Sequence, residues 1–172
     1  IINQPGKKEH DLIAVILAAG ISQRLKPFTK NIPKALLPLE DTTLLERSLS
    51  CIHENIQYHK ISKCLIVIGY KGEMIQKKIG KRYSGLTIDY IGNDEYSKTG
   101  SMYSLYCAKN KIKEDIILFE SDLIYESRAI KELLSLTYDN CFLASPPLLT
   151  GDDVFLLFDK ENQLYILLKK SY

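Results

Sequence analysis

Continuous apolar runs and segments with helical periodicity alternate along the chain. Leu12–Leu17 is an unbroken apolar run, the pattern of a strand that is buried on both faces of a parallel sheet. Cys64–Gly69 repeats that pattern, and the shorter runs Leu86–Ile91 and Ile116–Phe119 predict two more strands. We therefore expect a central sheet of buried strands.

Between these runs, apolar residues recur every three or four positions, which is typical of helices with one buried side. The helices are predicted over Thr43–Ile56, Gly72–Tyr83, Ser101–Lys109 and Ser127–Leu136. The helix over Ser101–Lys109 is expected to carry Met102, Leu105 and Tyr106 on one side.

The order of these elements predicts the fold class. Strands that alternate with helices through short connections imply right-handed crossovers, and hence a mostly parallel mixed sheet with helices on both faces. Strand-like runs follow at Cys141–Ala144, Val154–Phe158 and Leu164–Leu168. We expect a single-domain, Rossmann-like α/β fold over residues 12–172, preceded by an N-terminal extension of residues 1–11.

Parallel sheets also predict where a ligand binds. In open sheets of this kind, ligands lie outside the carboxyl ends of the strands. The loops that follow Leu17, Gly69, Ile91 and Phe119 should therefore converge on one pocket.

Charge and composition narrow the partners. The formal net charge is +2, whereas a general nucleic-acid binder needs a larger and more concentrated basic excess. No apolar run approaches the roughly 18 residues of a membrane span, and no charged-then-apolar leader precedes the domain. We expect a cytoplasmic protein that binds neither nucleic acid nor membrane. The four cysteines lack the spacing of a zinc site.

The segment after the first strand carries the chemistry. Ala18, Ala19 and Gly20 have almost no side chain, so that backbone N–H groups can approach the phosphates of a nucleotide. The dinucleotide fingerprint and the P-loop motif are both absent. Four cations follow, placed where a polyphosphate could lie: Arg24, Lys26, Lys30 and Lys34.

This segment resembles the nucleotide-binding pattern of the sugar-nucleotidyltransferase superfamily, L-A-A-G-x-S-x-R-L-x-P-x-T followed by P-K-x-L-L-P. Every fixed position is present between Leu17 and Pro38. The resemblance implies a nucleotide-diphospho-sugar transferase type of fold and nucleotidyl transfer, with Leu17, Ala18, Ala19 and Gly20 binding the nucleotide. It also implies that Lys34 contacts the α-phosphate and the acceptor, and that Arg24 holds the β- and γ-phosphates.

Two further loops gain a role from the same resemblance. Asp122 follows the fourth predicted strand and matches the aspartate that holds a catalytic Mg²⁺, although it could also cap the next helix. Asn93, Gly100 and Ser101 match the region that reads base and ribose, although residues 99–101 could simply cap a helix. Tyr70 either stacks near the base or covers the sheet.

The sequences of these loops resemble those of the small cytidylyltransferases most closely. The matching segments are T-G-S-M-Y-S-L at residues 99–105 and E-S-D-L-I-Y-E at residues 120–126. We expect CTP as donor and 2-aminoethylphosphonate as acceptor, with phosphocholine as the alternative. A primary amine prefers carboxylates, whereas a trimethylammonium group prefers an aromatic cage. Absence of tryptophan and the dispersal of eleven tyrosines favour the amine. Side chains that could bind it are Tyr103, Tyr106, Glu120, Asp152 and Asp153.

Other interpretations stay open. The family has a second metal carboxylate late in the domain, yet nothing after Lys160 matches it convincingly, so the domain could be incomplete at its C-terminal end. A fused or partner enzyme domain is a further open possibility. A hexose-1-phosphate nucleotidyltransferase or a non-catalytic nucleotide-sensing domain could share this fold. Arg24, Lys34 and Asp122 are all present, which favours catalysis.

Overall fold

A computed structural model of the chain describes residues 12–56, 61–136, 140–144, 154–160 and 164–169. The chain divides into two compact units, of which the first ends at Thr137 and the second begins at Tyr138. The predicted extension of residues 1–11 and the candidate amine ligands Asp152 and Asp153 lie outside the described residues.

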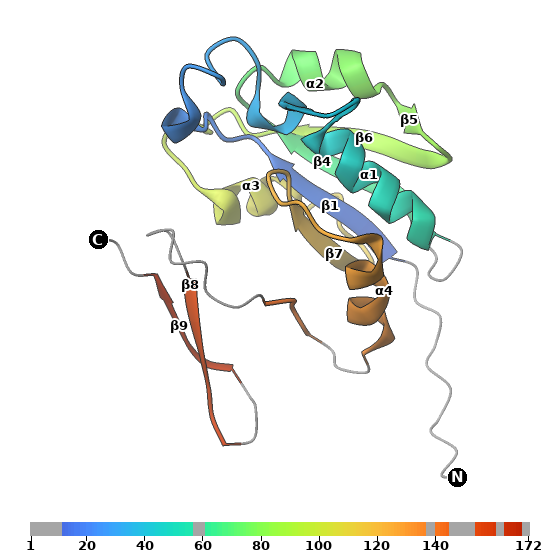
Figure 1. The fold of residues 1–172 in the computed structure, drawn as a ribbon, viewed down its shortest axis with the longest axis vertical. Coiled ribbons are helices and arrows are strands. Elements are labelled where there is room, and N and C mark those ends of the chain that lie inside the picture. The colour runs from blue at the N-terminus through green and yellow to red at the C-terminus, as the bar shows by residue number, and fades with distance from the viewer. Residues whose placement is uncertain (1–11, 57–60, 137–139, 145–153, 161–163, 170–172) are drawn as a thin grey trace. The chain divides into compact units, whose positions relative to one another are not determined.

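The first unit is built on a five-stranded sheet with the strand order β5-β6-β4-β1-β7 (Figure 1). β1 lies between β4 and β7, and all three run parallel, as does β6 beside β4. β5 pairs with β6 in the antiparallel sense. The strands are β1 (Leu12–Ala18), β4 (Ile61–Ile68), β5 (Arg82–Tyr83), β6 (Leu86–Gly92) and β7 (Asp115–Glu120).

Apolar clusters cover both faces of this sheet. One strand contributes to both clusters because its successive side chains point to opposite faces. On β1, Ala14 and Ile16 pack into one apolar cluster while Ile13 and Val15 pack into another. Residues of α1, α2 and α4 complete the first cluster, and residues of α3 complete the second (Figure 1). The helices are α1 (Leu44–Asn55), α2 (Gly72–Ile79), α3 (Ser101–Ala108) and α4 (Ser127–Ser135).

The predicted fold class is therefore confirmed: the sheet is mixed but mostly parallel, and helices cover both faces. Four short elements between β1 and α1 were not predicted from the sequence. They are the 3-10 helices η1 (Gln23–Leu25) and η2 (Lys34–Leu36) and a two-stranded sheet of β2 (Pro38–Leu39) and β3 (Thr42–Thr43).

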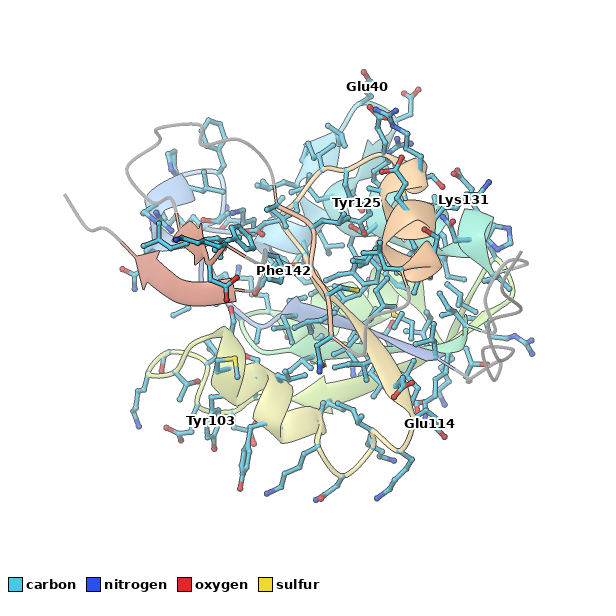
Figure 2. The ribbon with its side chains drawn as sticks, turned by 90° about the horizontal axis from the view of Figure 1, so that it is seen from below. Glu40, Tyr103, Glu114, Tyr125, Lys131 and Phe142 are labelled. Carbon is cyan, nitrogen blue, oxygen red and sulfur yellow. The ribbon has the colours of Figure 1, made fainter. Side chains whose placement is uncertain are left out.

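Two predicted helices differ in detail from the structure. α2 ends at Ile79 rather than at Tyr83, because Gly80 adopts a φ of 74° that turns the chain out of the helix and into β5. On α3, the predicted apolar side is not buried as a whole, since Met102 is 76% exposed and Tyr106 is 56% exposed. Small residues, Ser104 and Ala108, face the interior instead. Figure 2 shows Tyr103 also projecting from α3 away from the sheet.

The second unit contains β8 (Val154–Phe158) and β9 (Leu164–Lys169), which pair in the antiparallel sense as a two-stranded sheet. Both strands were predicted. The predicted strand at Cys141–Ala144 is wrong, because these residues have no regular secondary structure. Within the described residues, no helix is both long and apolar enough to cross a membrane.

Candidate active site

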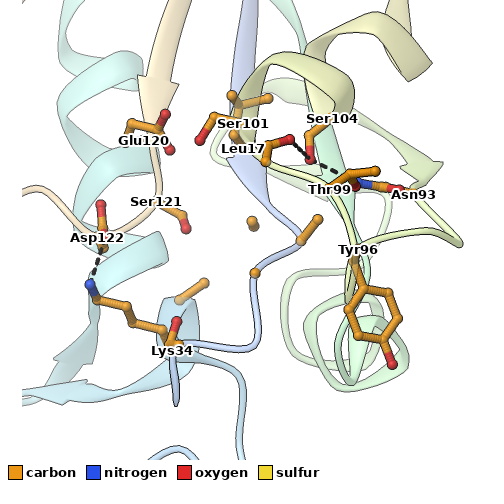
Figure 3. Close-up of a pocket in the computed structure, with 16 residues that line it drawn as sticks. Leu17, Lys34, Asn93, Tyr96, Thr99, Ser101, Ser104, Glu120, Ser121 and Asp122 are labelled. Atoms are coloured by element: carbon orange, nitrogen blue, oxygen red, sulfur yellow. Dashed lines mark hydrogen bonds and ion pairs between the residues drawn. The ribbon is translucent and has the colours of Figure 1, made fainter. Parts of the chain in front are cut away.

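A pocket lies at the carboxyl ends of β1, β6 and β7, where the sequence places it (Figure 3). The loops after Leu17, Ile91 and Phe119 converge there, and η2 contributes a further wall. Predicted site residues that line this pocket are Leu17, Ala18, Ala19, Gly20, Lys34, Asn93, Gly100, Ser101 and Asp122.

Two predicted site residues, Arg24 and Tyr70, are not among the described residues that line the pocket. Arg24 lies in η1 with an exposed side chain. The Tyr70 hydroxyl donates a 2.8 Å hydrogen bond to the Lys30 carbonyl, and its ring centroid lies 6.3 Å from that of Tyr96. Through this hydrogen bond, Tyr70 contacts the loop that carries Lys26 and Lys30. Of the two interpretations that the sequence left open for Tyr70, stacking near the base stays a prediction.

Backbone hydrogen bonds join the loops behind the pocket. The Tyr70 amide donates to the Ala19 carbonyl at 3.0 Å, and the Ser121 amide donates to the Leu17 carbonyl at 3.2 Å. Gly69 lies at the junction, where an added Cβ would come within 2.7 Å of the Ala19 carbonyl oxygen and of the Tyr96 Cβ. A glycine is needed at this position because the loops approach so closely.

Lys34 and Asp122 lie in contact with each other in the pocket although 88 positions separate them in the sequence. The Lys34 Nζ lies 2.5 Å from the Asp122 Oδ2, with the side chains 27% and 37% exposed (Figure 3). η2 fixes the start of the lysine side chain, since Leu36 donates its amide to the Pro33 carbonyl and Ala35 is buried. The structure thus pairs the predicted phosphate-binding cation with the predicted metal-binding carboxylate.

Glu120 is a second carboxylate in the pocket and was not among the predicted catalytic residues. Burial raises the pKa of the Glu120 carboxyl above its ordinary value, whereas a hydrogen bond from Ser101 and the nearby Lys34 ammonium oppose that rise. Asp122 adds to the increase through like-charge repulsion. The sequence could have indicated Glu120 as a site residue, because it lies two positions before Asp122 at the end of an apolar strand.

The remaining lining residues were not predicted as site residues, although several of them lie in the motifs that the sequence shares with the family. Tyr96 is the one aromatic side chain among the described lining residues. The others are Ser22, Ala35, Thr99, Ser104 and Ser121.

The carboxylates present suit one kind of metal ion. Mg²⁺ is commonly held by one or two carboxylates together with water and substrate phosphates. Asp122 and Glu120 offer that number of carboxylates, and the described residues contain no group of three or more His, Cys, Asp or Glu side chains that could enclose an ion. The donor set therefore fits Mg²⁺ that arrives with a nucleotide better than a metal held by the protein alone.

Sequence comparison finds cytidylyltransferase relatives. The chain is 27% identical over 135 residues to CMP-5'-(3-aminopropyl)phosphonate synthase of Streptomyces rubellomurinus, a match over 78% of this chain and 21% of that protein. It is 29% identical over 128 residues to choline-phosphate cytidylyltransferase of Streptococcus pneumoniae, over 73% of this chain and 51% of that protein. The chain thus spans about half or less of the length of these two relatives.

Structural comparison supports the fold. The CTP:phosphocholine cytidylyltransferase structure from Streptococcus pneumoniae superposes with a TM-score of 0.61 at 22% identity, over 94% of this chain and 65% of that one. At this level of identity, the likeness concerns the fold alone. The nucleotidyl transferase family matches residues 13–140, which include the whole pocket. The chain belongs to the nucleotidyl transferase family.

Proposed function

We propose that this pocket transfers CMP from CTP to 2-aminoethylphosphonate. A phosphonate oxygen of the acceptor attacks the α-phosphorus of CTP, the bond from that phosphorus to the bridging oxygen of the β-phosphate breaks, and pyrophosphate leaves. The observation that carries the proposal is the meeting of Lys34 and Asp122 beside the backbone of Leu17–Gly20. That arrangement offers a cation, a metal ligand and phosphate-binding amides in one place.

Each group has a separate task in this reaction. Negative charge on the phosphate oxygens rises toward the transition state, so the Lys34 ammonium stabilises the transition state by ~3–4 kcal/mol, by analogy with other preorganised donors. Asp122, with Glu120 beside it, would hold Mg²⁺, which when bound neutralises the triphosphate and the departing pyrophosphate. Arg24 remains proposed for the β- and γ-phosphates as a planar donor fork, although it lies outside the pocket lining.

The charge of the pocket favours an acceptor with a primary amine. Glu120 supplies a carboxylate besides the proposed metal ligand Asp122, whereas Tyr96 is the one aromatic side chain among the described lining residues. A trimethylammonium group prefers several aromatic faces. The relative from Streptomyces rubellomurinus is named for an aminopropylphosphonate product, which supports the same acceptor class. Phosphocholine remains the second candidate because another relative is a choline-phosphate cytidylyltransferase.

The proposal is tested by measuring pyrophosphate release with each of the four nucleoside triphosphates and magnesium. The acceptors compared are 2-aminoethylphosphonate, phosphocholine and glucose-1-phosphate. We expect the fastest release with CTP and 2-aminoethylphosphonate. Replacement Lys34→Ala should lower turnover about 10²–10³-fold without unfolding the protein. The exposed Lys77 serves as control, since Lys77→Ala should leave the rate unchanged.

Other outcomes of this assay lead to different conclusions. A preference for glucose-1-phosphate would make the chain a hexose-1-phosphate nucleotidyltransferase. Absence of release with every pair would favour a nucleotide-sensing domain. We place the reaction in the cytoplasm, and a possible fused or partner enzyme domain remains part of the proposal.

A further inference from the structure

Asn93 is almost completely buried and its side chain is engaged within the protein. It is 1% exposed, and its Nδ2 donates to the Thr99 Oγ1 at 3.1 Å and to the Ser104 Oγ at 3.0 Å (Figure 3). Its Oδ1 accepts the Glu95 amide at 3.0 Å. The backbone amide of Asn93 donates to the Ile68 carbonyl at 2.8 Å, which ties this network to the end of β4.

The groups that Asn93 holds form one wall of the pocket. Thr99, Gly100, Ser101 and Ser104 all line it. The two hydroxyls bonded to Asn93 also donate to backbone carbonyls of the same segment. The Thr99 hydroxyl donates to the Glu95 carbonyl at 2.8 Å, and the Ser104 hydroxyl donates to the Gly100 carbonyl at 3.4 Å. Asn93 thus connects both ends of residues 95–104.

A carboxamide has two N–H donors and one oxygen acceptor, and here both donors and the acceptor have protein partners. We propose that Asn93 is a positioning residue: it does not contact the nucleotide, but holds residues 95–104 in the conformation that receives it. This inference rests on the proposed function, since it assumes that the pocket binds a nucleoside triphosphate. It replaces the expectation that Asn93 itself reads base or ribose.

Asn55 provides a matched control elsewhere in the same unit. It is 2% exposed, and its Nδ2 donates to the Cys51 carbonyl at 2.8 Å, the Ser127 carbonyl at 3.2 Å and the Ser127 Oγ at 3.0 Å. These bonds join α1 to the start of α4 and do not involve described residues of the pocket lining. A substitution at Asn55 should therefore remove a buried, hydrogen-bonded amide without changing the conformation of the pocket wall at residues 95–104.

The experiment compares Asn93→Leu with Asn55→Leu, since leucine keeps a similar volume and removes every hydrogen bond of the side chain. Amide hydrogen exchange over residues 93–104 and the Kd for CTP with magnesium are both measured. We expect similar decreases in Tm. Only Asn93→Leu should accelerate exchange over residues 93–104, by about tenfold, and weaken CTP binding, also by about tenfold.

Ser104→Ala gives a milder variant that removes one hydrogen-bond partner of Asn93. It should accelerate the same exchange by about threefold. Because the two residues act through one network, Asn93→Leu combined with Ser104→Ala should weaken CTP binding no more than Asn93→Leu alone. Additive losses would mean separate contacts with the nucleotide and would overturn the positioning role.

Hydrogen exchange separates this inference from the proposed function. Wild-type protein that shows no CTP binding would overturn the proposed function. The role of Asn93 in positioning residues 95–104 would still be tested by the amide hydrogen exchange of Asn93→Leu. Unchanged exchange in Asn93→Leu and in Ser104→Ala would refute the positioning role even if CTP binds. A loss of kcat with an unchanged KM for CTP would also refute it, because that pattern indicates contact with the transition state.

Discussion

At the scale of single residues, the pocket holds two carboxylates and one ammonium group. Lys34 lies against Asp122, and it also lowers the pKa of Glu120 against the effect of burial. This arrangement keeps the local charge small while the triphosphate is absent. If Asp122 holds Mg²⁺ as proposed, the metal ion and the Lys34 ammonium would compete for the same carboxylate.

This competition predicts that removal of the lysine improves metal binding while it lowers turnover. Lys34→Met should raise the affinity for Mn²⁺ in the absence of nucleotide by up to about fivefold, since partly exposed ion pairs are worth ~0.2–1 kcal/mol. Electron paramagnetic resonance of free Mn²⁺ provides the measurement. Lys63 pairs with Asp89 at 2.8 Å with similar exposure, so Lys63→Met is the matched control and should leave Mn²⁺ affinity unchanged. Equal or weaker Mn²⁺ binding by Lys34→Met would contradict competition at Asp122.

Glu120 predicts a pH-dependent effect on stability. Because its pKa is raised in the folded state, ionisation of Glu120 destabilises the fold at pH values above its raised pKa. Glu120→Gln should therefore raise Tm at about pH 7.5, and this advantage should shrink as the pH falls from the raised pKa to the ordinary carboxyl value near pH 4.3. Thermal scans across that range test it, with the exposed Glu114→Gln as control. A lower Tm for Glu120→Gln at about pH 7.5 would argue against this effect.

At the scale of elements, the pocket depends on the close approach of three loops. β1, β4 and β6 end beside one another, and their loops meet where Gly69 faces Ala19 and Tyr96. Tyr70 and Lys71 then extend from the same turn to the carbonyls of Lys30 and Asn31. The turn after β4 therefore contacts both Ala19 in the pocket lining and the loop that carries Lys30.

Gly69→Ala tests this junction. The new methyl group would lie 2.7 Å from the Ala19 carbonyl oxygen, so the loops must separate, at a cost of ~1–3 kcal/mol. We expect a lower Tm and CTP binding weakened by about tenfold or more. Calorimetric titration with CTP and magnesium measures the latter. At Gly92 an added Cβ would meet only the Asp94 Oδ1 at 3.5 Å, so Gly92→Ala should bind CTP normally. Normal CTP binding by Gly69→Ala would show that the junction does not shape the pocket.

At the scale of the whole molecule, the sequence predicted the layers of the fold well because apolar periodicity reports burial directly. Four central strands and four helices lie close to the predicted ranges. The exceptions are local: Gly80 ends α2 early, and on α3 the buried positions are small residues rather than Met102 and Tyr106. Periodicity alone does not distinguish a large exposed side chain from a buried one.

The candidate site was predictable where a motif fixes the backbone and less so where a side chain can turn. Leu17–Gly20, Lys34 and Asp122 surround one pocket because strand order brings their loops together. For Tyr70 the sequence left two interpretations open, near the base or over the sheet, and it did not indicate the hydrogen bond that Tyr70 makes to a carbonyl 40 positions away. Such contacts between distant segments leave no local pattern. Functional roles of all these residues remain proposals.

The central claim is that the pocket joins CMP to a phosphonate. Phosphorus-31 NMR of CTP, 2-aminoethylphosphonate and magnesium with the wild-type protein tests it directly, with Lys34→Ala in parallel. We predict loss of CTP, an equal amount of pyrophosphate and a pair of coupled doublets from a phosphonate–phosphate anhydride, with all three changes about 10²–10³-fold slower for Lys34→Ala. Unchanged spectra with the wild-type protein, or orthophosphate without the doublets, would contradict the claim.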